Sequence, residues 1–239
     1  MNKLFNHMLV PVDQEDEEGI VQQALHMADC LHCQIHLLYK ISDARWEKQI
    51  IDYSKRHAVD LILLVKKKRT GHSQLRTVAD VDRLVDKTLC PVLTVSDQPA
   101  LSSLKNIVLP VGDHLPMRKL LFATYLGRTV NSTIHLVAPA NNSDPAMAVG
   151  MRHNLQKCYR LLRENTNLSV ECQASPEENL AEAAWDYAKK IKADLILTSP
   201  GKESMLSGFW NNLRSKFFRR KGSRSLPNTS QIPVMTILS

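Results

Sequence analysis

The chain of 239 residues has few cysteines, glycines and prolines, and it has no long apolar run. Its five cysteines are scattered along the sequence, which excludes a disulfide scaffold and favours a reducing compartment. Eight glycines and 11 prolines exclude a collagen-like chain, and a hydrophobic content of 44% excludes a disordered one. No apolar segment reaches the roughly 18 residues needed to cross a bilayer, and the first residues lack the pattern of a signal peptide. We therefore expect a soluble, cytoplasmic protein.

The net charge of +7 is distributed unevenly along the chain. Residues 1–100 carry a net charge of −1, whereas residues 101–239 carry +8, of which +6 lies within residues 202–224. Nearly all the excess charge thus lies in one segment, which does not indicate a diffuse nucleic-acid-binding surface. The local clustering therefore predicts no nucleic-acid partner.

Four short apolar blocks occur twice, in the same order. Residues 7–13 return at 106–112 and residues 35–37 at 134–136, both displaced by 99 positions. Residues 60–63 return at 194–197, displaced by 134, and residues 90–95 return at 232–237, displaced by 142. Because the order is kept, we interpret the chain as two related domains in tandem.

The repeated blocks are short and rich in Val, Ile and Leu, which is typical of buried strands, and the segments between them have helical spacing. This alternation predicts an α/β fold with two tandem Rossmann-like, doubly wound parallel sheets. We place the domains at residues 1–97 and 105–239, with a linker at 98–104. The second domain has 35 extra residues after its second strand, enough for a helix at about 146–165 and a strand at 168–173. The first domain is therefore the trimmed one.

These repeated residues resemble the universal stress protein family. The resemblance rests on Val10-Pro11-Val12-Asp13, Asp60-Leu61-Ile62-Leu63 and Cys90-Pro91-Val92-Leu93, and it covers nearly the whole chain twice, as in tandem members of the family. It implies stress-response function and an intramolecular pair of domains like the family's usual homodimer. It also implies ATP, or another adenine nucleotide, as the cofactor to consider.

The glycine motif of the nucleotide-binding members is degenerate in this chain. That motif, Gly-x2-Gly-x9-Gly-Ser/Thr, follows the fourth strand, where glycines let the backbone approach phosphates. In the first domain its four positions fall on Val65, Lys68, Val78 and Ala79. In the second domain the first two fall on Ser199 and Lys202, and Gly222-Ser223 follows at a longer interval than the family uses. The pattern predicts weak or lost ATP binding.

Several residues remain candidates for nucleotide or anion binding. Asp13 matches the acidic residue that faces the nucleotide in the family, but it can equally cap the following helix. The run containing Lys66 and Lys68 lies where α/β sheets bind ligands, although such a run is more often a solvated loop. In the second domain the candidates are Gly112, Asp113, Lys202, Gly222 and Ser223.

No catalytic or metal-binding pattern is evident. Cys30-Leu31-His32-Cys33 lacks a second ligand pair and closes a helix rather than opening one, so we interpret its cysteines as buried structural residues. Cys90, Cys158 and Cys172 are also predicted to lie in the core. The sequence has no Gly-x-Ser-x-Gly elbow and no His-Glu-x-x-His motif. We therefore predict no metal site and no enzymatic activity.

A basic amphipathic helix is predicted within an insertion at about 203–222. One stripe of the segment 204–222 is apolar and aromatic, and cations gather toward its end. This helix could pack on its own domain, dock on a protein partner or lie on an anionic membrane surface. The candidate contact residues are Phe209, Trp210, Leu213, Phe217, Arg219 and Arg220.

These observations favour a non-catalytic regulatory or stress-response binding module with weak or lost ATP binding. One alternative is a universal stress protein that binds ATP through its second domain. Another is a cytoplasmic regulator of a membrane transporter that uses the basic helix 204–222. The expected contacts are pairing of the two domains, a possible homodimer and a possible protein partner at that helix.

Overall fold

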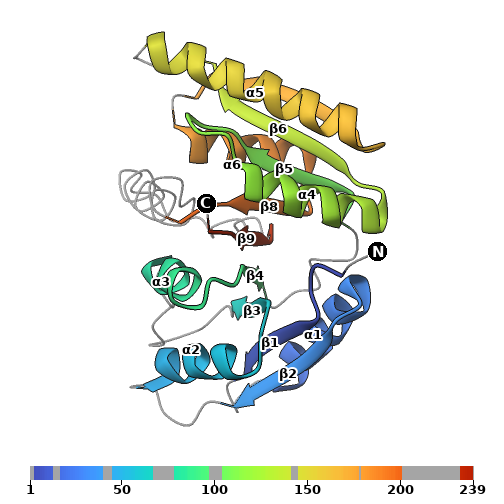
Figure 1. Cartoon of the computed structure of the whole chain (residues 1–239), viewed down its shortest axis with the longest axis vertical. Helices are drawn as coiled ribbons and strands as arrows, with labels where there is room; N and C mark the ends of the chain where they lie inside the picture. Colours follow the sequence, from blue (N-terminus) through green and yellow to red (C-terminus); the bar gives the residue numbers. More distant parts are fainter. Residues whose placement is uncertain are drawn as a thin grey trace, which may run out of the picture.

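The structure is a computed structural model, and it describes residues 3–12, 17–39, 45–66, 78–96, 104–140, 145–177, 179–200 and 232–238. It consists of one mixed sheet with helices on both faces, as the element order and the strand pairing show (Figure 1). Among the described residues, no helix combines the length and the apolar character that a membrane span requires.

The first half of the chain, residues 3–96, alternates strands and helices. Its strands are β1 (His7–Val12), β2 (Gln34–Tyr39), β3 (Leu61–Lys66) and β4 (Val92–Ser96). Its helices are α1 (Glu17–Leu31), α2 (Trp46–Arg56) and α3 (Val78–Thr88). The predicted apolar stripe of α1 is buried throughout, from Ile20 through Ala24 and Met27 to Leu31. This spacing of three and four residues explains why the segment forms a helix against the sheet.

The second half, residues 104–238, repeats this order with one additional helix and strand. Its strands are β5 (Asn106–Pro110), β6 (Thr133–Pro139), β7 (Ser169–Ser175), β8 (Leu195–Thr198) and β9 (Val234–Thr236). Its helices are α4 (Met117–Val130), α5 (Pro145–Asn165) and α6 (Leu180–Ile191). The side chain of Asn179 caps α6 by accepting hydrogen bonds from the amides of Ala181 and Glu182.

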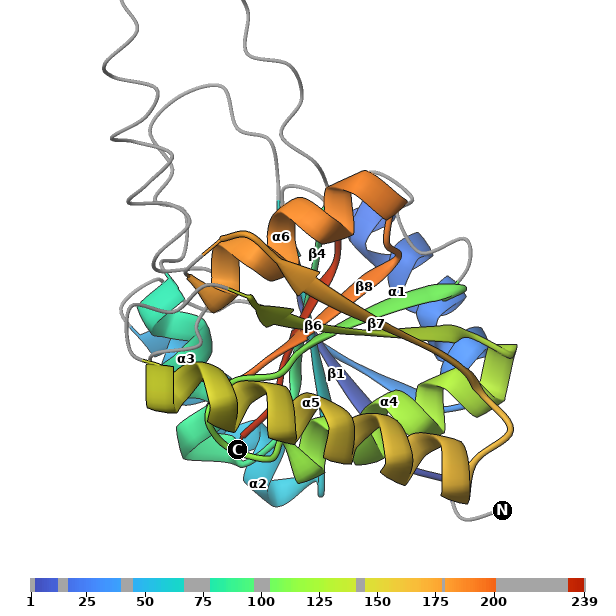
Figure 2. The same cartoon turned by 90° about the horizontal axis from the view of Figure 1, so that it is seen from above.

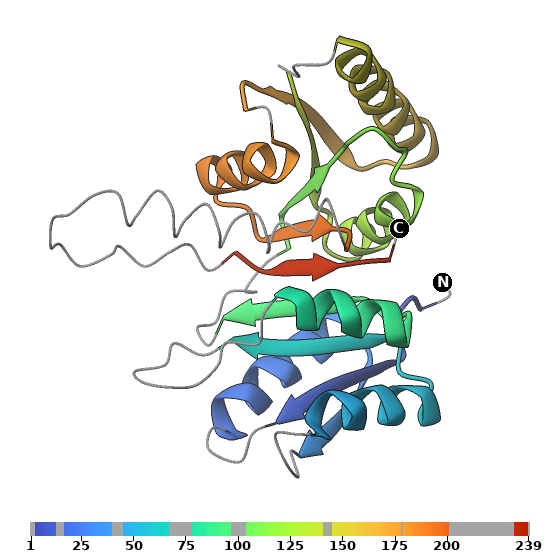
Figure 3. The ribbon, with the colours of Figure 1, turned by 90° about the vertical axis from the view of Figure 1, so that its left-hand side faces the viewer.

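The two halves share a nine-stranded sheet in the order β2-β1-β3-β4-β9-β8-β5-β6-β7. Neighbouring strands within each half are parallel, whereas β4 and β9 pair antiparallel, with Leu93 opposite Met235 (Figure 3). The last strands of the two halves therefore pair with each other at the centre of the sheet. This antiparallel seam is the only change of direction among the described strand pairs.

The helices on one face of the sheet cover a core that both halves share. Alternate strand residues point into it together with buried residues of α1, α4 and α5. Phe5 is fully buried, and its ring centroid lies 5.7 Å from that of Phe122 and 6.0 Å from that of Tyr125 in the other half. On the opposite face the core is divided, because α2 and α3 cover one cluster and α6 covers another. The halves are thus tied together by the seam and by one face of the sheet.

The α/β fold with largely parallel, doubly wound strands is confirmed, and so is the shorter first half. After β2 the chain enters α2 at Trp46, whereas after β6 it first forms α5 and β7 (Figure 2). The expected helix at 146–165 and strand at 168–173 match α5 and β7 within two residues. The domain boundaries remain a prediction, because most of the proposed linker lies outside the described residues.

Candidate functional site

The candidate site of the second half lies where β5 turns into α4. The amide of Val111 donates to the carbonyl of Val137 at 2.8 Å, which holds the turn against β6. Gly112 is buried and Asp113 is exposed. The structure therefore brings Gly112 and Asp113 to the carboxyl edge of the sheet, where α/β folds bind their ligands.

The side chain of Asn154 closes this turn from α5. Its Nδ2 atom lies 3.1 Å from the carbonyl oxygen of Gly112 and 2.7 Å from that of Asp113. An amide nitrogen carries two hydrogens, so one side chain can satisfy both carbonyls. The Asp113 carboxylate lies 3.8 Å from Nε2 of His114, and both side chains are largely exposed. The backbone of the turn is thus fixed from within the chain, while the Asp113 carboxylate stays accessible.

A buried lysine lies beneath the same turn. Lys119 is only 2% exposed, and its Nζ atom donates to the carbonyl of Pro110 at 3.2 Å. Its positive charge also acts on the thiol of Cys158, which is fully buried. Burial nevertheless raises the pKa of Cys158 to about 12, because desolvation of the thiolate outweighs the attraction of Lys119. Cys158 is therefore a neutral thiol at physiological pH.

Ser199, the first position of the degenerate glycine motif, directly follows strand β8 and lies beside this turn. Ser199 is 2% exposed, and its hydroxyl makes no hydrogen bond within the described part of the chain. The carboxyl ends of β5 and β8 are neighbours, since Val108 pairs with Ile196. Lys202, Gly222 and Ser223, which the sequence placed with this site, lie outside the described residues.

In the first half the corresponding edge carries a packed side chain instead of a glycine. Val65 is paired with Val95 within the sheet and packs against the shared core. Lys66 is the last residue of β3 and pairs with Ser96. The side chain of Lys66 and the whole of Asp13 and Lys68 lie outside the described residues. The first position of the glycine motif in this half is therefore occupied by a β-branched side chain that is partly buried against the core.

The segment proposed as a contact helix is also not described. Phe209, Trp210, Leu213, Phe217, Arg219 and Arg220 all lie outside the described residues, so their roles remain predictions.

Three cysteine predictions were wrong. Cys90 and Cys158 are buried, as predicted, but Cys172 is exposed and Cys30 and Cys33 are only partly buried. Cys172 lies on β7, the edge strand of the sheet beside β6. Burial raises the pKa of Cys33 to about 11 and also raises that of Cys172. Within the described residues no cluster of three or more metal-binding side chains is present.

A histidine–tyrosine pair occurs in both halves at the amino edge of the sheet. In the first half Nδ1 of His36 lies 3.2 Å from the Tyr53 hydroxyl, and its Nε2 lies 3.0 Å from Nδ1 of His7. In the second half Nδ1 of His135 lies 3.1 Å from the Tyr187 hydroxyl. The displacements of 99 and 134 residues relate these positions, but we did not interpret the repeated histidine. The repeat was the signal that could have revealed the pair.

The surroundings of the two histidines differ in charge. His135 is 5% exposed, its Nε2 lies 3.2 Å from Oδ1 of Asn106, and its Nδ1 lies 3.3 Å from Oε2 of Glu171. Burial lowers the pKa of His135, and the Glu171 carboxylate partly opposes that shift. Burial also lowers the pKa of His36, and the nearby imidazoles of His7 and His57 add to the effect.

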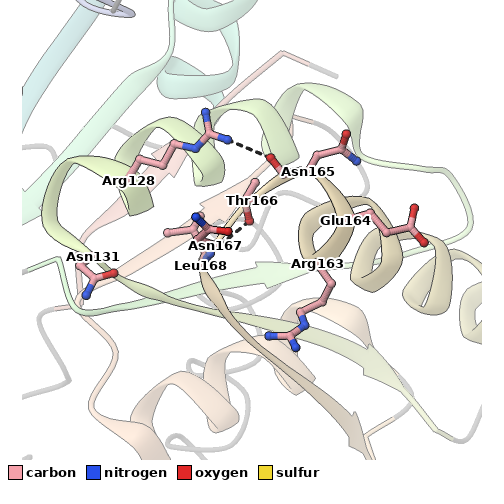
Figure 4. A pocket seen from close by; sticks show the side chains of 8 residues that line it. All are labelled: Arg128, Asn131, Arg163, Glu164, Asn165, Thr166, Asn167 and Leu168. Atoms are coloured by element: carbon pink, nitrogen blue, oxygen red, sulfur yellow. Dashed lines mark hydrogen bonds between the residues drawn. The ribbon is translucent and has the colours of Figure 1, made fainter.

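A polar pocket of about 490 Å³ lies at the same amino edge, between the end of α4 and the turn from α5 to β7 (Figure 4). Arg128 donates to the carbonyl of Asn165 at 2.9 Å, and the amide of Leu168 donates to the Thr166 hydroxyl. The arginine thereby satisfies a carbonyl at the carboxyl end of a helix, which is a common structural arrangement. The pocket is far from the strand ends that carry the candidate nucleotide site.

Comparison with solved structures assigns the fold. A universal stress protein from Archaeoglobus fulgidus DSM 4304 is 12% identical, with a TM-score of 0.58 over 98% of this chain and 96% of that one. The protein has a universal stress protein fold. A functionally unknown protein from Pseudomonas aeruginosa PAO1 has the same TM-score at 14% identity, covering 99% of this chain and 93% of that one. A proposed universal stress protein from Pseudomonas aeruginosa UCBPP-PA14 has a TM-score of 0.55 at 14% identity, covering 99% and 94%.

Sequence comparisons add no assignment to this fold. No family model matches the chain, and no curated protein matches it. The likeness to universal stress proteins is therefore one of structure, and it extends over nearly the full length of each chain compared.

Proposed function

We propose that the protein is a non-catalytic regulatory module of the universal stress type, located in the cytoplasm, with weak or lost ATP binding. The observation that carries the proposal is that a side chain larger than glycine occupies each of the two strand ends at which a phosphate loop would begin. Val65 is partly buried and packs against the core, and the side chain of Ser199 is buried. A phosphate cannot approach the backbone closely where a Cβ and its substituents already fill the space.

The turn after β5 is held by side chains of the same half. Asn154 donates to the carbonyls of Gly112 and Asp113, and Lys119 donates to that of Pro110. These three carbonyls are therefore satisfied by donors of the chain itself. The exposed Asp113 carboxylate could still contact a nucleotide, and Lys202, Gly222 and Ser223 remain candidates from the sequence, so we place any residual binding in the second half.

Titration calorimetry with ATP, with and without magnesium, on protein freed of copurified nucleotide tests the proposal. We expect no measurable heat at micromolar ATP and no ATP hydrolysis. Micromolar binding that Asp113→Ala abolishes would overturn the proposal in favour of an ATP-binding second half. Glu182→Ala is the matched control, because Glu182 is an acidic residue of the same half that lies on α6.

The proposal also includes the intramolecular pairing of the two halves into one module. Since β4 and β9 form the seam and Phe5 packs against Phe122, each half completes the core of the other. A ligand or partner that changes the conformation of one half would therefore also affect the other half through this shared core.

A further inference from the structure

Strand β7 leaves one edge of the nine-stranded sheet open. It pairs with β6 along all seven of its residues, Ser169–Ser175, and no described strand lies on its other side. An edge strand presents unpaired amide and carbonyl groups, and proteins usually protect such edges with lysine, proline or a bulge. Strand β7 contains neither lysine nor proline, its one charged residue is Glu171, and its pairing with β6 is continuous.

The opposite edge strand of the sheet, β2, receives a side-chain hydrogen bond from another element of the chain. Nε2 of the Gln49 side chain donates to the backbone carbonyl of Tyr39, at the end of β2, at 3.0 Å. The polar groups of that edge are thus partly satisfied within the chain. On β7 the side-chain amide of Gln173 donates to the carbonyl of the neighbouring Ala174 at 2.6 Å, and no side-chain bond from another element reaches the β7 backbone among the described residues.

The sequence of β7 is chemically symmetric about Cys172. An antiparallel pairing of β7 with a second β7, centred on Cys172, sets Glu171 opposite Gln173, Val170 opposite Ala174 and Ser169 opposite Ser175. Each of these pairs matches like with like or an acceptor with a donor, and the two exposed Cys172 side chains meet at the axis. A surface that complements itself in this way is the requirement for a two-fold symmetric interface.

The helix layer permits this pairing. Helix α5 packs over both β6 and β7, so its axis lies about midway between them. With strands about 4.8 Å apart, the two α5 helices of a β7–β7 dimer would lie about 10 Å apart on one face, which is the usual distance between packed helices. Helix α6 packs chiefly on β5 and β6, so the other face of β7 remains accessible.

We infer that the outer edge of β7 is a homodimerisation surface, at which a second copy of this chain pairs antiparallel about Cys172 and joins the two sheets into one. The surface is distinct from the seam between the halves, and it uses no residue of the candidate nucleotide site.

Sedimentation velocity of the full chain, reduced and at concentrations up to about 0.5 mM, tests this inference. We expect a reversible dimer. Cys172→Lys should raise its dissociation constant about tenfold or more, because two ammonium groups would meet at the axis. An equimolar mixture of Cys172→Lys and Cys172→Glu should associate within about threefold of the unsubstituted chain, because opposite charges then meet.

Leu25→Lys is the matched control, since Leu25 is an exposed apolar residue on α1 and not on this edge. It should leave the dissociation constant unchanged. A chain that stays monomeric, a Cys172→Lys variant that dimerises as well as the unsubstituted chain, or a mixture that associates no better than either variant alone would overturn the inference. Slower amide hydrogen exchange across residues 169–175 at high protein concentration would place the interface on β7 itself.

Discussion

Nδ1 of His135 lies 3.1 Å from the hydroxyl of Tyr187, and the His36–Tyr53 pair repeats this contact at 3.2 Å in the other half. Each pair joins the second strand of its half to the helix that packs against it. In the second half Nε2 of His135 lies 3.2 Å from Oδ1 of Asn106, and Nδ1 lies near both the Tyr187 hydroxyl and Oε2 of Glu171. A protonated ring would donate from both nitrogens.

This arrangement predicts that acidification destabilises the protein. The folded state lowers the pKa of His135 and of His36 below the ordinary value, so the unfolded chain binds protons more readily. The stabilising contribution of these histidines to the free energy of unfolding is fully present above about pH 6.5. It is lost as the pH falls toward the lower pKa of the folded state, and the free energy then changes by at most about 1.4 kcal/mol per pH unit for each proton. Urea unfolding between about pH 5 and 7 measures that slope.

The variant His135→Gln should have a smaller slope, because its side chain does not titrate. His153→Gln is the control, since His153 is exposed on α5 and should leave the slope unchanged. An identical slope in His135→Gln and the unsubstituted chain would show that His135 does not carry the effect.

Phe5 is predicted to couple the two halves. Its ring is fully buried between them, against Phe122 and Tyr125. Phe5→Ala should lower the free energy of unfolding by about 3–5 kcal/mol, the usual cost of deleting a buried phenyl ring. Calorimetry should also show a broader transition, because the halves lose a shared contact. Leu25→Ala, at an exposed position of α1, should change stability by less than about 0.5 kcal/mol.

Two helical glycines should respond in opposite directions to alanine. At Gly127 of α4 a Cβ would lie 2.9 Å from Cδ1 of Leu168, which is itself buried, and 3.3 Å from Cδ1 of Ile134. At Gly150 of α5 a Cβ would meet nothing within 4 Å. Gly150→Ala should therefore stabilise by about 0.5–1 kcal/mol.

Gly127→Ala should be about 1–3 kcal/mol less stable than Gly150→Ala, because the added methyl must displace packed side chains. Chemical denaturation of the two variants side by side gives this difference. Equal stability of the two variants would mean that Leu168 moves aside without cost.

The sequence predicted the strands and most helices because each strand is a short apolar block that occurs twice. The Ile107–Leu109 block illustrates why, since its alternate residues are buried on both faces of a parallel sheet. The exposure of Cys172 was not predictable, because the sequence of an apolar or neutral strand does not indicate whether the strand lies at the edge of its sheet. The contact of Asn154 with Gly112 was equally hidden, since 42 residues separate them.

The degenerate nucleotide site was likewise predictable from the sequence only in part. Counting from Asp60 placed the first motif position on Val65, near the end of β3, and the structure shows that this residue packs against the shared core. Sequence spacing could not show that the turn after β5 is held by α5, a helix that the first half lacks. Asp60 and Asp194 were noticed only as parts of repeated blocks. Each accepts a hydrogen bond from the backbone of the first strand of its half, which explains why the aspartate is repeated.

The seam between β4 and β9 also sets an order of events during biosynthesis. Strand β4 leaves the ribosome more than a hundred residues before Val234–Thr236, so the nascent first half exposes a bare sheet edge while the second half is being translated. Parallel pairing of β9 with β8 and antiparallel pairing with β4 are then completed by the same three residues. The step that finishes the second half is therefore also the step that shields the first, and a chaperone that binds exposed strand edges would act on the first half for the whole of that interval.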